Sequence, residues 1–245
     1  GFSFASAEAC YNAYTSELYR FDQLYRIYHE AADAVYARSP DALSPLTARV
    51  EQDYLNGFLQ PLAQKWDSFL DAGLLPQWKL PGVPNQQSFF AEQVERYLKG
   101  GDDRRIFVVI SDALRYEVAQ ELSESLNSKY RFAAELESQL GVLPSYTKLG
   151  MASLLPHKNL SYTDAGLVQV DGLSSDGLDA RNKILAAEGG LALRAEDFLT
   201  MNKTDGRELI KPHRLIYIYH NRIDAVGDSS STESSTFSAC RETIE

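Results

Sequence analysis

The first hundred residues carry apolar side chains at helical spacing. One stripe consists of Tyr11, Tyr14, Leu18, Phe21, Leu24, Tyr28 and Val35. A second stripe, after the helix-breaking segment 38–45, consists of Leu46, Val50, Tyr54, Phe58, Leu62, Trp66 and Leu70. Intervals of three, four and seven residues place these side chains on one face of a helix. We therefore expect two long helices, the second kinked or split at Pro61, and a third helix capped by Asn85.

From Asp102 onward, short β-branched runs alternate with amphipathic segments. The pattern predicts strands at 104–110, 130–136, 166–170 and 214–220. It predicts helices at 114–127, 149–155, 178–188, 194–201 and 205–210. Such alternation indicates an α/β fold, with a mostly parallel sheet flanked by helices on both faces. The sequence thus predicts a helical region over 1–101 and an α/β domain over 102–245.

Composition narrows the class of protein. The chain has 245 residues, of which 44% are hydrophobic and 24% charged, as in soluble globular proteins. Its formal net charge of −10 does not steer the protein onto nucleic acid, although a local basic groove could still bind it. The tyrosines at helical spacing favour a core or an interface over base stacking.

The cysteines and the apolar runs bear on location. Cys10 and Cys240 lie far apart and lack metal-type spacing, so we expect reduced thiols in a cytoplasmic protein. No apolar run reaches the roughly 18 residues of a membrane helix, so we expect no membrane partner. The chain begins with Gly1, and its last residues resemble the start of a helix. These features suggest a piece of a longer protein.

Asp112 directly follows the predicted strand 104–110, in "VVISDALRYE". Ligands of α/β sheets bind at this strand end, and a carboxylate there suits a divalent cation. An Asp just before a helix also suits an N-cap, and this motif alone leaves both interpretations open. Arg115, one turn into the predicted helix, would point at an anion held nearby.

Thr147 lies where "LPSYT" meets a short predicted helix. A helix N-terminus favours an anion. A hydroxyl there is either a capping group or a nucleophile whose pKa a metal lowers, and the motif alone favours the cap.

A third polar stretch, "YIYHNRIDAVGD", follows the predicted strand 214–220. Asp224 and Asp228 are four residues apart and could both reach one cation, although such pairs also arise by chance in acidic chains. His220 ends the strand. The serine-rich run after Gly227 predicts a flexible loop.

The order of these motifs resembles the alkaline phosphatase superfamily. The segments "VVISDALRYEVAQEL", "LPSYTKLGMASLLPH", "GLDARNKIL" and "YIYHNRIDAVGD" are similar to the PglZ family of bacterial BREX phage-defence systems, over residues 102–245. The resemblance implies an alkaline phosphatase-like fold, incomplete at its C-terminal side. It also implies a metal-dependent phosphoesterase, a phosphatase or phosphodiesterase, in anti-phage defence.

The same resemblance assigns roles to residues. Thr147 would be the nucleophile, Asp112, Asp224 and Asp228 metal ligands, and Arg115 a phosphate-binding residue. Two divalent cations are implied for the longer protein. Asp228 stands where the superfamily has His, which shifts the preference from zinc toward manganese or magnesium. His220 would restore a nitrogen ligand, so zinc stays an alternative.

The resemblance also bears on partners and on alternatives. A later Asp-His-Gly motif of the superfamily does not occur in these 245 residues, so we expect the chain alone to be inactive. Expected partners are a phosphoester substrate and other BREX proteins, including a DNA methyltransferase. Two alternatives stay open: a non-catalytic scaffold domain of the defence complex, and a metal-dependent nuclease acting on nucleic acid.

Overall fold

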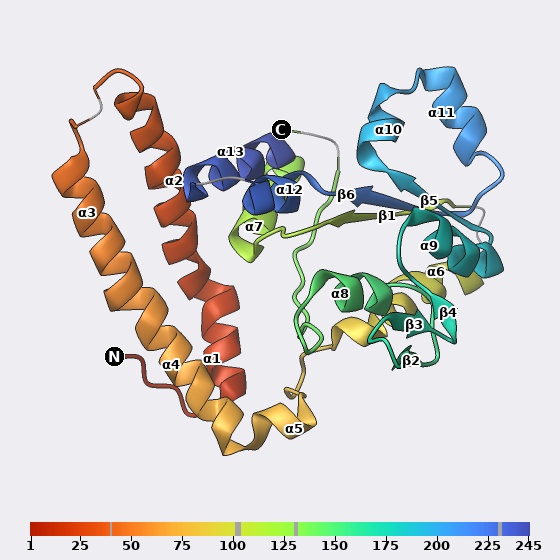
Figure 1. Ribbon diagram of the computed structural model, residues 1–245, viewed down its shortest axis with the longest axis horizontal. Helices are drawn as coiled ribbons and strands as arrows, with labels where there is room; N and C mark the ends of the chain where they lie inside the picture. Colours follow the sequence, from red (N-terminus) through yellow and green to blue (C-terminus); the bar gives the residue numbers. More distant parts are fainter. Residues whose placement is uncertain (40, 101–103, 130–131, 230–231) are drawn as a thin grey trace. The chain divides into compact units, whose positions relative to one another are not determined.

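The computed structural model describes residues 1–39, 41–100, 104–129, 132–229 and 232–245 (Figure 1). The chain forms two compact units that alternate along the sequence. Unit 1 comprises Gly1–Gly82, Ala113–Ser138 and Arg222–Glu245, and unit 2 comprises Val83–Asp112 and Gln139–Asn221. Each unit therefore brings together segments that are far apart in sequence.

The elements of secondary structure that the structure describes in unit 1 are all helices. They are α1 (Ala7–Ala13), η1 (Tyr14–Leu18), α2 (Tyr19–Tyr36), α3 (Ser44–Gln52), η2 (Asp53–Leu59), α4 (Gln60–Phe69), η3 (Leu70–Leu74), α5 (Leu75–Gln77), α7 (Tyr116–Lys129), α12 (Arg222–Ser229) and α13 (Glu233–Ile244). The two long helices predicted from the apolar stripes are confirmed, and they separate within the segment 38–45.

Aromatic side chains of the two predicted helices pack against each other. The rings of Tyr25 and Tyr54 stack with their centroids 3.9 Å apart, and those of Phe21 and Phe58 stack at 4.6 Å. The chain stays helical through Pro61, the second residue of α4, and widens into the π-helical η2 just before it. A wider turn accommodates a residue that lacks an N–H and crowds the preceding turn, so the expected break does not occur.

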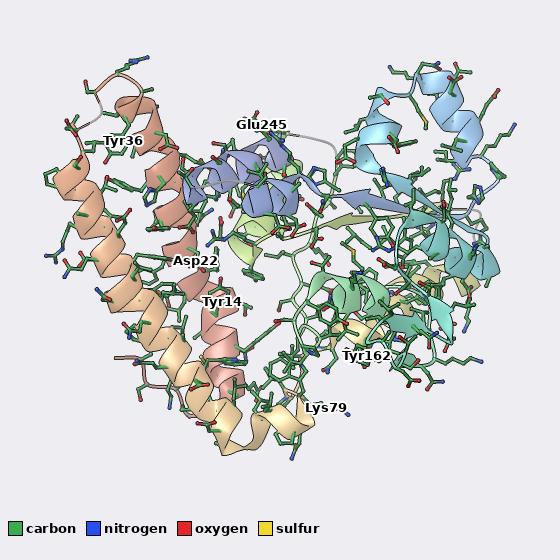
Figure 2. All side chains as sticks on the ribbon, viewed as in Figure 1. Tyr14, Asp22, Tyr36, Lys79, Tyr162 and Glu245 are labelled. Carbon is green, nitrogen blue, oxygen red and sulfur yellow. The ribbon has the colours of Figure 1, made fainter. Side chains whose placement is uncertain are left out.

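A buried carboxylate also joins these helices. Asp22, 7% exposed, accepts hydrogen bonds from the hydroxyl of Tyr14 at 2.5 Å and from that of Tyr54 at 2.6 Å. Figure 2 labels Tyr14 and Asp22. Burial raises the pKa of Tyr14, and the hydrogen bond to Asp22 raises it further. Both phenols thus remain donors, and they satisfy a carboxylate that would otherwise be costly to bury.

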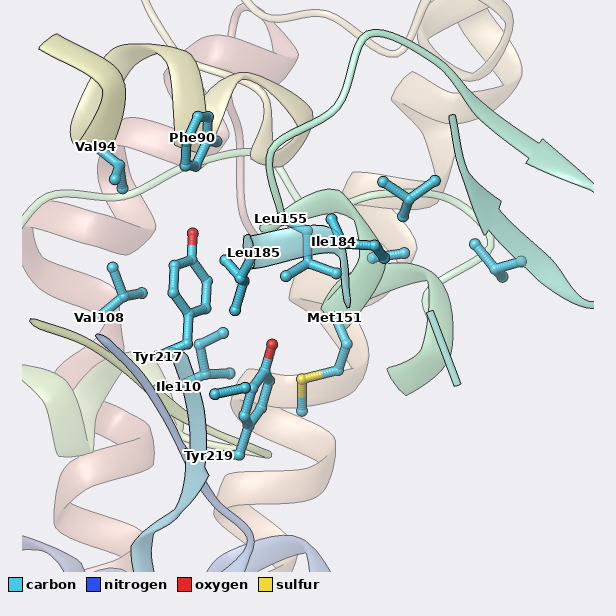
Figure 3. Packing of buried hydrophobic residues seen from close by; sticks show 14 of the residues in the cluster. Phe90, Val94, Val108, Ile110, Met151, Leu155, Ile184, Leu185, Tyr217 and Tyr219 are labelled. Atoms are coloured by element: carbon cyan, nitrogen blue, oxygen red, sulfur yellow. The ribbon is translucent and has the colours of Figure 1, made fainter. Parts of the chain in front are cut away.

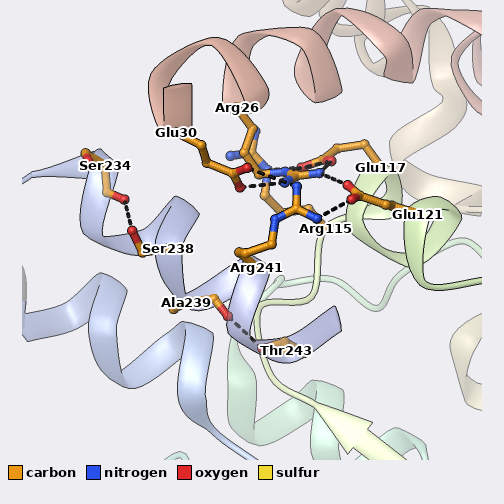
Figure 4. Close-up of polar contacts among 10 residues, drawn as sticks. All are labelled: Arg26, Glu30, Arg115, Glu117, Glu121, Ser234, Ser238, Ala239, Arg241 and Thr243. Atoms are coloured by element: carbon orange, nitrogen blue, oxygen red, sulfur yellow. Dashed lines mark hydrogen bonds and ion pairs between the residues drawn. The ribbon is translucent and has the colours of Figure 1, made fainter. Parts of the chain in front are cut away.

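An ion-pair cluster connects α2, α7 and α13. Arg26 is fully buried, and its guanidinium donates to Glu117 at 2.9 Å, to Glu121 at 2.5 Å and to Glu30 at 2.6 Å. Arg241 of α13 donates to Glu121 and to Glu30, the latter at 2.9 Å (Figure 4). Helices from three distant parts of the sequence thus share one charge network.

Unit 2 contains the strands that the structure describes. Its elements are η4 (Gln86–Ser88), η5 (Phe90–Glu95), α6 (Arg96–Lys99), β1 (Ile106–Ser111), α8 (Thr147–Ser153), β2 (Leu160–Tyr162), β3 (Val168–Val170), β4 (Leu173–Ser174), α9 (Leu178–Leu185), η6 (Ala186–Glu188), β5 (Gly190–Arg194), α10 (Ala195–Thr200), α11 (Lys203–Ile210) and β6 (Leu215–His220). Asn85 precedes η4 in extended conformation, at the predicted cap position.

A parallel sheet in the order β1-β6-β5 forms the centre of unit 2. Ile106 pairs with Leu215 and Ser111 with His220, so β1 and β6 end at the same level. A second, antiparallel sheet has the order β2-β3-β4. The prediction of an α/β fold with a parallel sheet, preceded by a helical region, is confirmed.

The core of unit 2 lies on one face of the parallel sheet. Tyr217 and Tyr219 of β6 pack there with α8 and α9, as Figure 3 shows, and the Tyr217 hydroxyl donates to the Leu154 carbonyl at 2.8 Å. On the opposite face of β1, Phe107 and Val109 are 47% and 63% exposed. The described chain therefore covers one face of β1, where the sequence pattern predicted helices over both.

Three local predictions were wrong. Residues 132–136 of the predicted strand 130–136 form no strand, and residues 130 and 131 lie outside the described residues; the Asn127 side chain takes both backbone hydrogen bonds of Ala134. The strand β5 was missed, because "GGLALR" contains only a short run of apolar residues. The serine-rich segment is mostly helical, in α12 and α13, with residues 230–231 outside the described ranges.

Cys10 and Cys240 are buried free thiols, as predicted. Among the described residues, no helix is both long enough and apolar enough to cross a bilayer.

Candidate functional site

Asp112 and His220 lie at the carboxyl ends of two neighbouring strands. Asp112 directly follows β1, and His220 is the last residue of β6. The Asp112 N–H donates to the His220 carbonyl at 2.9 Å, which continues the β1–β6 pairing by one residue. Both side chains are half-buried. The carboxyl end of a parallel sheet is where α/β folds place ligands, so unit 2 brings one oxygen and one nitrogen donor to such an edge.

Ser111 orients the imidazole of His220. Its hydroxyl lies 2.9 Å from His220 Nδ1. With Nδ1 donating to Ser111, Nε2 carries the lone pair, which is the arrangement of a histidine held for metal binding. Ser111 was not among the site residues predicted from the sequence, although its place before Asp112 at a strand end is a signal that could have identified it.

The chain turns sharply after Asp112. Ala113 has φ 59°, in the left-handed region, where a residue with a Cβ is strained by about 1–2 kcal/mol. Helix α7 starts only at Tyr116, and its first backbone bond runs from Ala119 N–H to the Arg115 carbonyl. Asp112 is therefore not the N-cap of this helix, which removes the capping interpretation. Strained turns of this kind cluster at functional sites.

Thr147 is the first residue of α8, as predicted. Tyr146 occupies the N-cap position, so Thr147 is not the capping residue that its motif alone favoured. Its side chain is exposed, and its hydroxyl has no partner among the described residues. Leu149 and Met151 of the same helix are buried in the core formed with β1 and β6. The helix is thus fixed to the sheet while the hydroxyl stays available.

Asp224 and Asp228 lie one turn apart on α12, in unit 1. Residues four apart in a helix share a face, so both carboxylates point the same way; Asp224 is half-buried and Asp228 exposed. The helix itself is anchored by Ile223, which packs with Val118, Ala239 and Cys240.

Arg115 also belongs to unit 1, and it precedes α7 instead of lying one turn inside it as predicted. The turn at Ala113 delays the start of the helix. Its guanidinium lies 3.7 Å from Glu117 and 3.9 Å from Glu233, and 5.6 Å from the centre of the Phe237 ring. These separations exceed hydrogen-bond length, so Arg115 is held in place by charge and stacking while its donors can still bind an anion.

The donor chemistry fits divalent cations. Asp112, Asp224 and Asp228 provide oxygens and His220 a nitrogen, a set that suits zinc, manganese or magnesium. Within the described ranges, no three His, Cys, Asp or Glu side chains gather into one metal-binding cluster. These residues thus fit a metal by donor type alone, and the described chain does not gather them into one site.

Residues 89–245 match the family described as the BREX system PglZ alkaline phosphatase-like domain. This chain belongs to the PglZ family. It is 44% identical over 247 aligned residues to the alkaline phosphatase-like protein BrxZ of Escherichia coli O9:H4 (strain HS), with 100% of the chain covered. It is 35% identical over 237 residues to the alkaline phosphatase-like protein PglZ of Bacillus cereus (strain H3081.97), with 96% covered.

The chain spans 29% of the length of BrxZ and 27% of that of the Bacillus PglZ protein. The family resemblance found in the sequence is thus confirmed. Both relatives align with the helical N-terminal region as well as with the PglZ segment, because nearly the whole chain is covered. Activity, substrates and partners concern the longer protein.

Proposed function

We propose that the PglZ-family protein containing this chain is a metal-dependent phosphoesterase that acts in anti-phage defence. The observation that carries the proposal is Thr147: its hydroxyl is exposed and unpartnered among the described residues. Its helix is packed on the sheet whose carboxyl edge bears Asp112 and His220. Membership in an alkaline phosphatase-like family supports the same chemistry.

In the proposed reaction, the Thr147 oxygen attacks the phosphorus of a phosphoester. A bond forms between that oxygen and phosphorus as the bond to the leaving oxygen breaks, and the hydroxyl proton ends on the leaving group. Water then attacks phosphorus and breaks the bond to Thr147, which regains its proton. Covalent catalysis of this kind splits one difficult substitution into two easier ones.

Two divalent cations would be held by Asp112, His220, Asp224 and Asp228 together with ligands from the rest of the protein. Bound there, they would lower the pKa of the attacking hydroxyl and neutralise charge on the phosphoryl group. Arg115 would bind the non-bridging oxygens, since a guanidinium forms charge-assisted hydrogen bonds to phosphate. We further propose cytoplasmic action alongside other BREX proteins, including a DNA methyltransferase.

The test uses the full-length protein with phosphomonoester and phosphodiester substrates and added zinc, manganese or magnesium. Thr147→Ala should lower turnover about 10³-fold or more, because the nucleophile is lost. Thr147→Ser, which keeps a hydroxyl, should retain much of the activity. Bound metal, measured by mass spectrometry, should be unchanged in both variants. Wild-type turnover by Thr147→Ala would refute the nucleophile assignment.

A scaffold role is the second candidate, favoured by an apolar groove in unit 1. The groove has a volume of about 560 Å³ and lies between α2 and the helix that follows it. Phe21 and Leu24 line it and are 48% and 64% exposed. Aromatic residues are enriched at protein interfaces. Retained complex assembly with no turnover under any metal would favour this role, whereas turnover abolished by Asp112→Ala would favour the enzyme.

A further inference from the structure

The acidic residues are distributed unevenly between the two units. Unit 1 contains 20 acidic and 11 basic residues, whereas unit 2 contains 14 and 13. The net charge of −10 therefore resides almost entirely in unit 1. Unit 2 is nearly neutral, so its own net charge does not oppose binding to nucleic acid.

A basic stripe runs along α11 of unit 2. Lys203 is the first residue of this helix, Arg207 follows four residues later, and Lys211 follows after another four, directly past the helix end. Residues four apart lie on one face, about 6 Å apart along the axis. All three are exposed, and none has an ion-pair partner among the described residues. A different side of α11 faces inward, where Gly206 is buried against Phe198.

The chain after α11 adds further positive charge. Arg105 donates from Nε to the His213 carbonyl at 2.9 Å and from Nη2 to the Lys211 carbonyl at 3.2 Å. The Ile106 N–H donates to the Arg214 carbonyl at 2.8 Å. These bonds fix Arg105 beside Lys211 and Arg214. The acceptors of Arg105 are neutral carbonyls, and within the described ranges Arg105 forms no ion pair.

Within unit 2, this basic surface lies away from Asp112 and His220. Arg105 and Arg214 precede the first residues of β1 and β6, whereas Asp112 and His220 stand at the other ends of the same strands. Six residues of extended chain span about 20 Å. A partner bound at the basic surface would therefore leave the other edge of the sheet accessible.

We propose that the surface formed by Lys203, Arg207, Lys211 and Arg105 binds the phosphate backbone of double-stranded DNA. The regularly spaced cations of α11 match a partner with regularly repeated anions, which an acidic protein surface lacks. None of the four side chains is aromatic, so the surface offers no platform for stacking the bases of a single strand. Contacts of lysine and arginine with phosphates fix position and read no sequence.

The test measures binding of a fluorescent duplex DNA to the full-length protein by anisotropy between about 50 and 200 mM salt. At the lowest salt concentration, the variant Lys203→Gln/Arg207→Gln/Lys211→Gln should bind the duplex at least about tenfold more weakly than wild type. Its plot of log affinity against log salt should be shallower by about 2 to 3, because each lost phosphate contact removes nearly one unit of slope.

The matched control is Arg20→Gln/Arg38→Gln/Lys79→Gln, three exposed positions of unit 1. It changes the net charge equally and should retain wild-type affinity and slope. Three results would overturn the proposal: wild-type affinity in the α11 variant, an equal loss in the control, or preference of the wild type for a single strand over the duplex. Thr147→Ala should bind DNA normally, so failure of the proposed catalytic role would be distinguishable.

Discussion

At the scale of single residues, the least expected feature is the complete burial of Arg26. Its acidic partners come from α2 and α7, and Glu117 is as deeply buried as Arg26 itself. No sequence pattern predicts this buried ion pair, because Arg26 and Glu117 are 91 residues apart. Each has the sequence context of a surface residue on an amphipathic helix. By contrast, Asp112 and Thr147 could be placed from sequence, since strand ends and helix starts are marked by local chemistry.

Arg26→Met should destabilise the protein by about 3–5 kcal/mol, because the change leaves Glu117 as an unpaired buried charge. Chemical denaturation followed by circular dichroism measures the loss. Arg49→Met is the matched control, since Arg49 pairs with Asp53 on the exposed surface and should leave the unfolding free energy nearly unchanged. Equal effects of the two substitutions would contradict the account of the buried cluster.

The same cluster predicts a pH dependence. Burial alone would raise the pKa of Glu121, but hydrogen bonds from Arg26 and Arg241 lower it below its usual 4.5. A lowered carboxyl pKa adds stability that is present above pH 4.5 and is lost as the pH falls through the pKa in the folded state. Arg241→Gln should therefore be destabilising at pH 7, and the difference from wild type should shrink below pH 4.5. Denaturant unfolding at pH 7 and pH 4 checks this; a constant difference would contradict it.

At the scale of elements, periodic segments were predictable and short ones were not. The helices of residues 5–70 and the strands β1 and β6 were evident, because long apolar stripes and β-branched runs reflect burial directly. β5 was missed because its five residues include Gly190 and Ala192, which lower strand propensity. Residues 132–136 have strand-like composition but find no neighbouring strand, so composition alone gave the wrong answer.

Gly190 illustrates why this strand carries a residue of low propensity. A Cβ at this position would lie 3.0 Å from the Leu185 carbonyl oxygen and 3.1 Å from Leu185 Cβ. Gly190→Ala should therefore cost about 1–3 kcal/mol through overpacking between α9 and β5.

Gly227→Ala provides the control for Gly190→Ala. Gly227 lies within α12, and its nearest neighbour to an added Cβ is the Thr236 hydroxyl at an ordinary 3.8 Å. Alanine should raise helix stability there by up to about 1 kcal/mol. Thermal unfolding of both variants measures the contrast, and a stabilised Gly190→Ala variant would show that the tight contact is misassigned.

At the scale of the whole molecule, the chain alternates between two units, and the sequence pattern did not predict this. The helices α7, α12 and α13 complete unit 1, although they occur within and after the strands of unit 2. Alternation of this kind depends on long-range packing, such as Cys240 and Ala239 against Val118, which local periodicity does not encode. The proposed ligands Asp112 and His220 belong to unit 2, while Asp224 and Asp228 belong to unit 1.

The central claim is that Thr147 is the nucleophile of a phosphoester hydrolase. The most direct measurement is to quench the reaction of the full-length protein with acid and to map phosphate on its peptides by mass spectrometry. We expect phosphate on Thr147, formed only with substrate and divalent metal and absent from Thr147→Ala. Turnover of substrate with no phosphate on Thr147, or with phosphate on another residue, would contradict it.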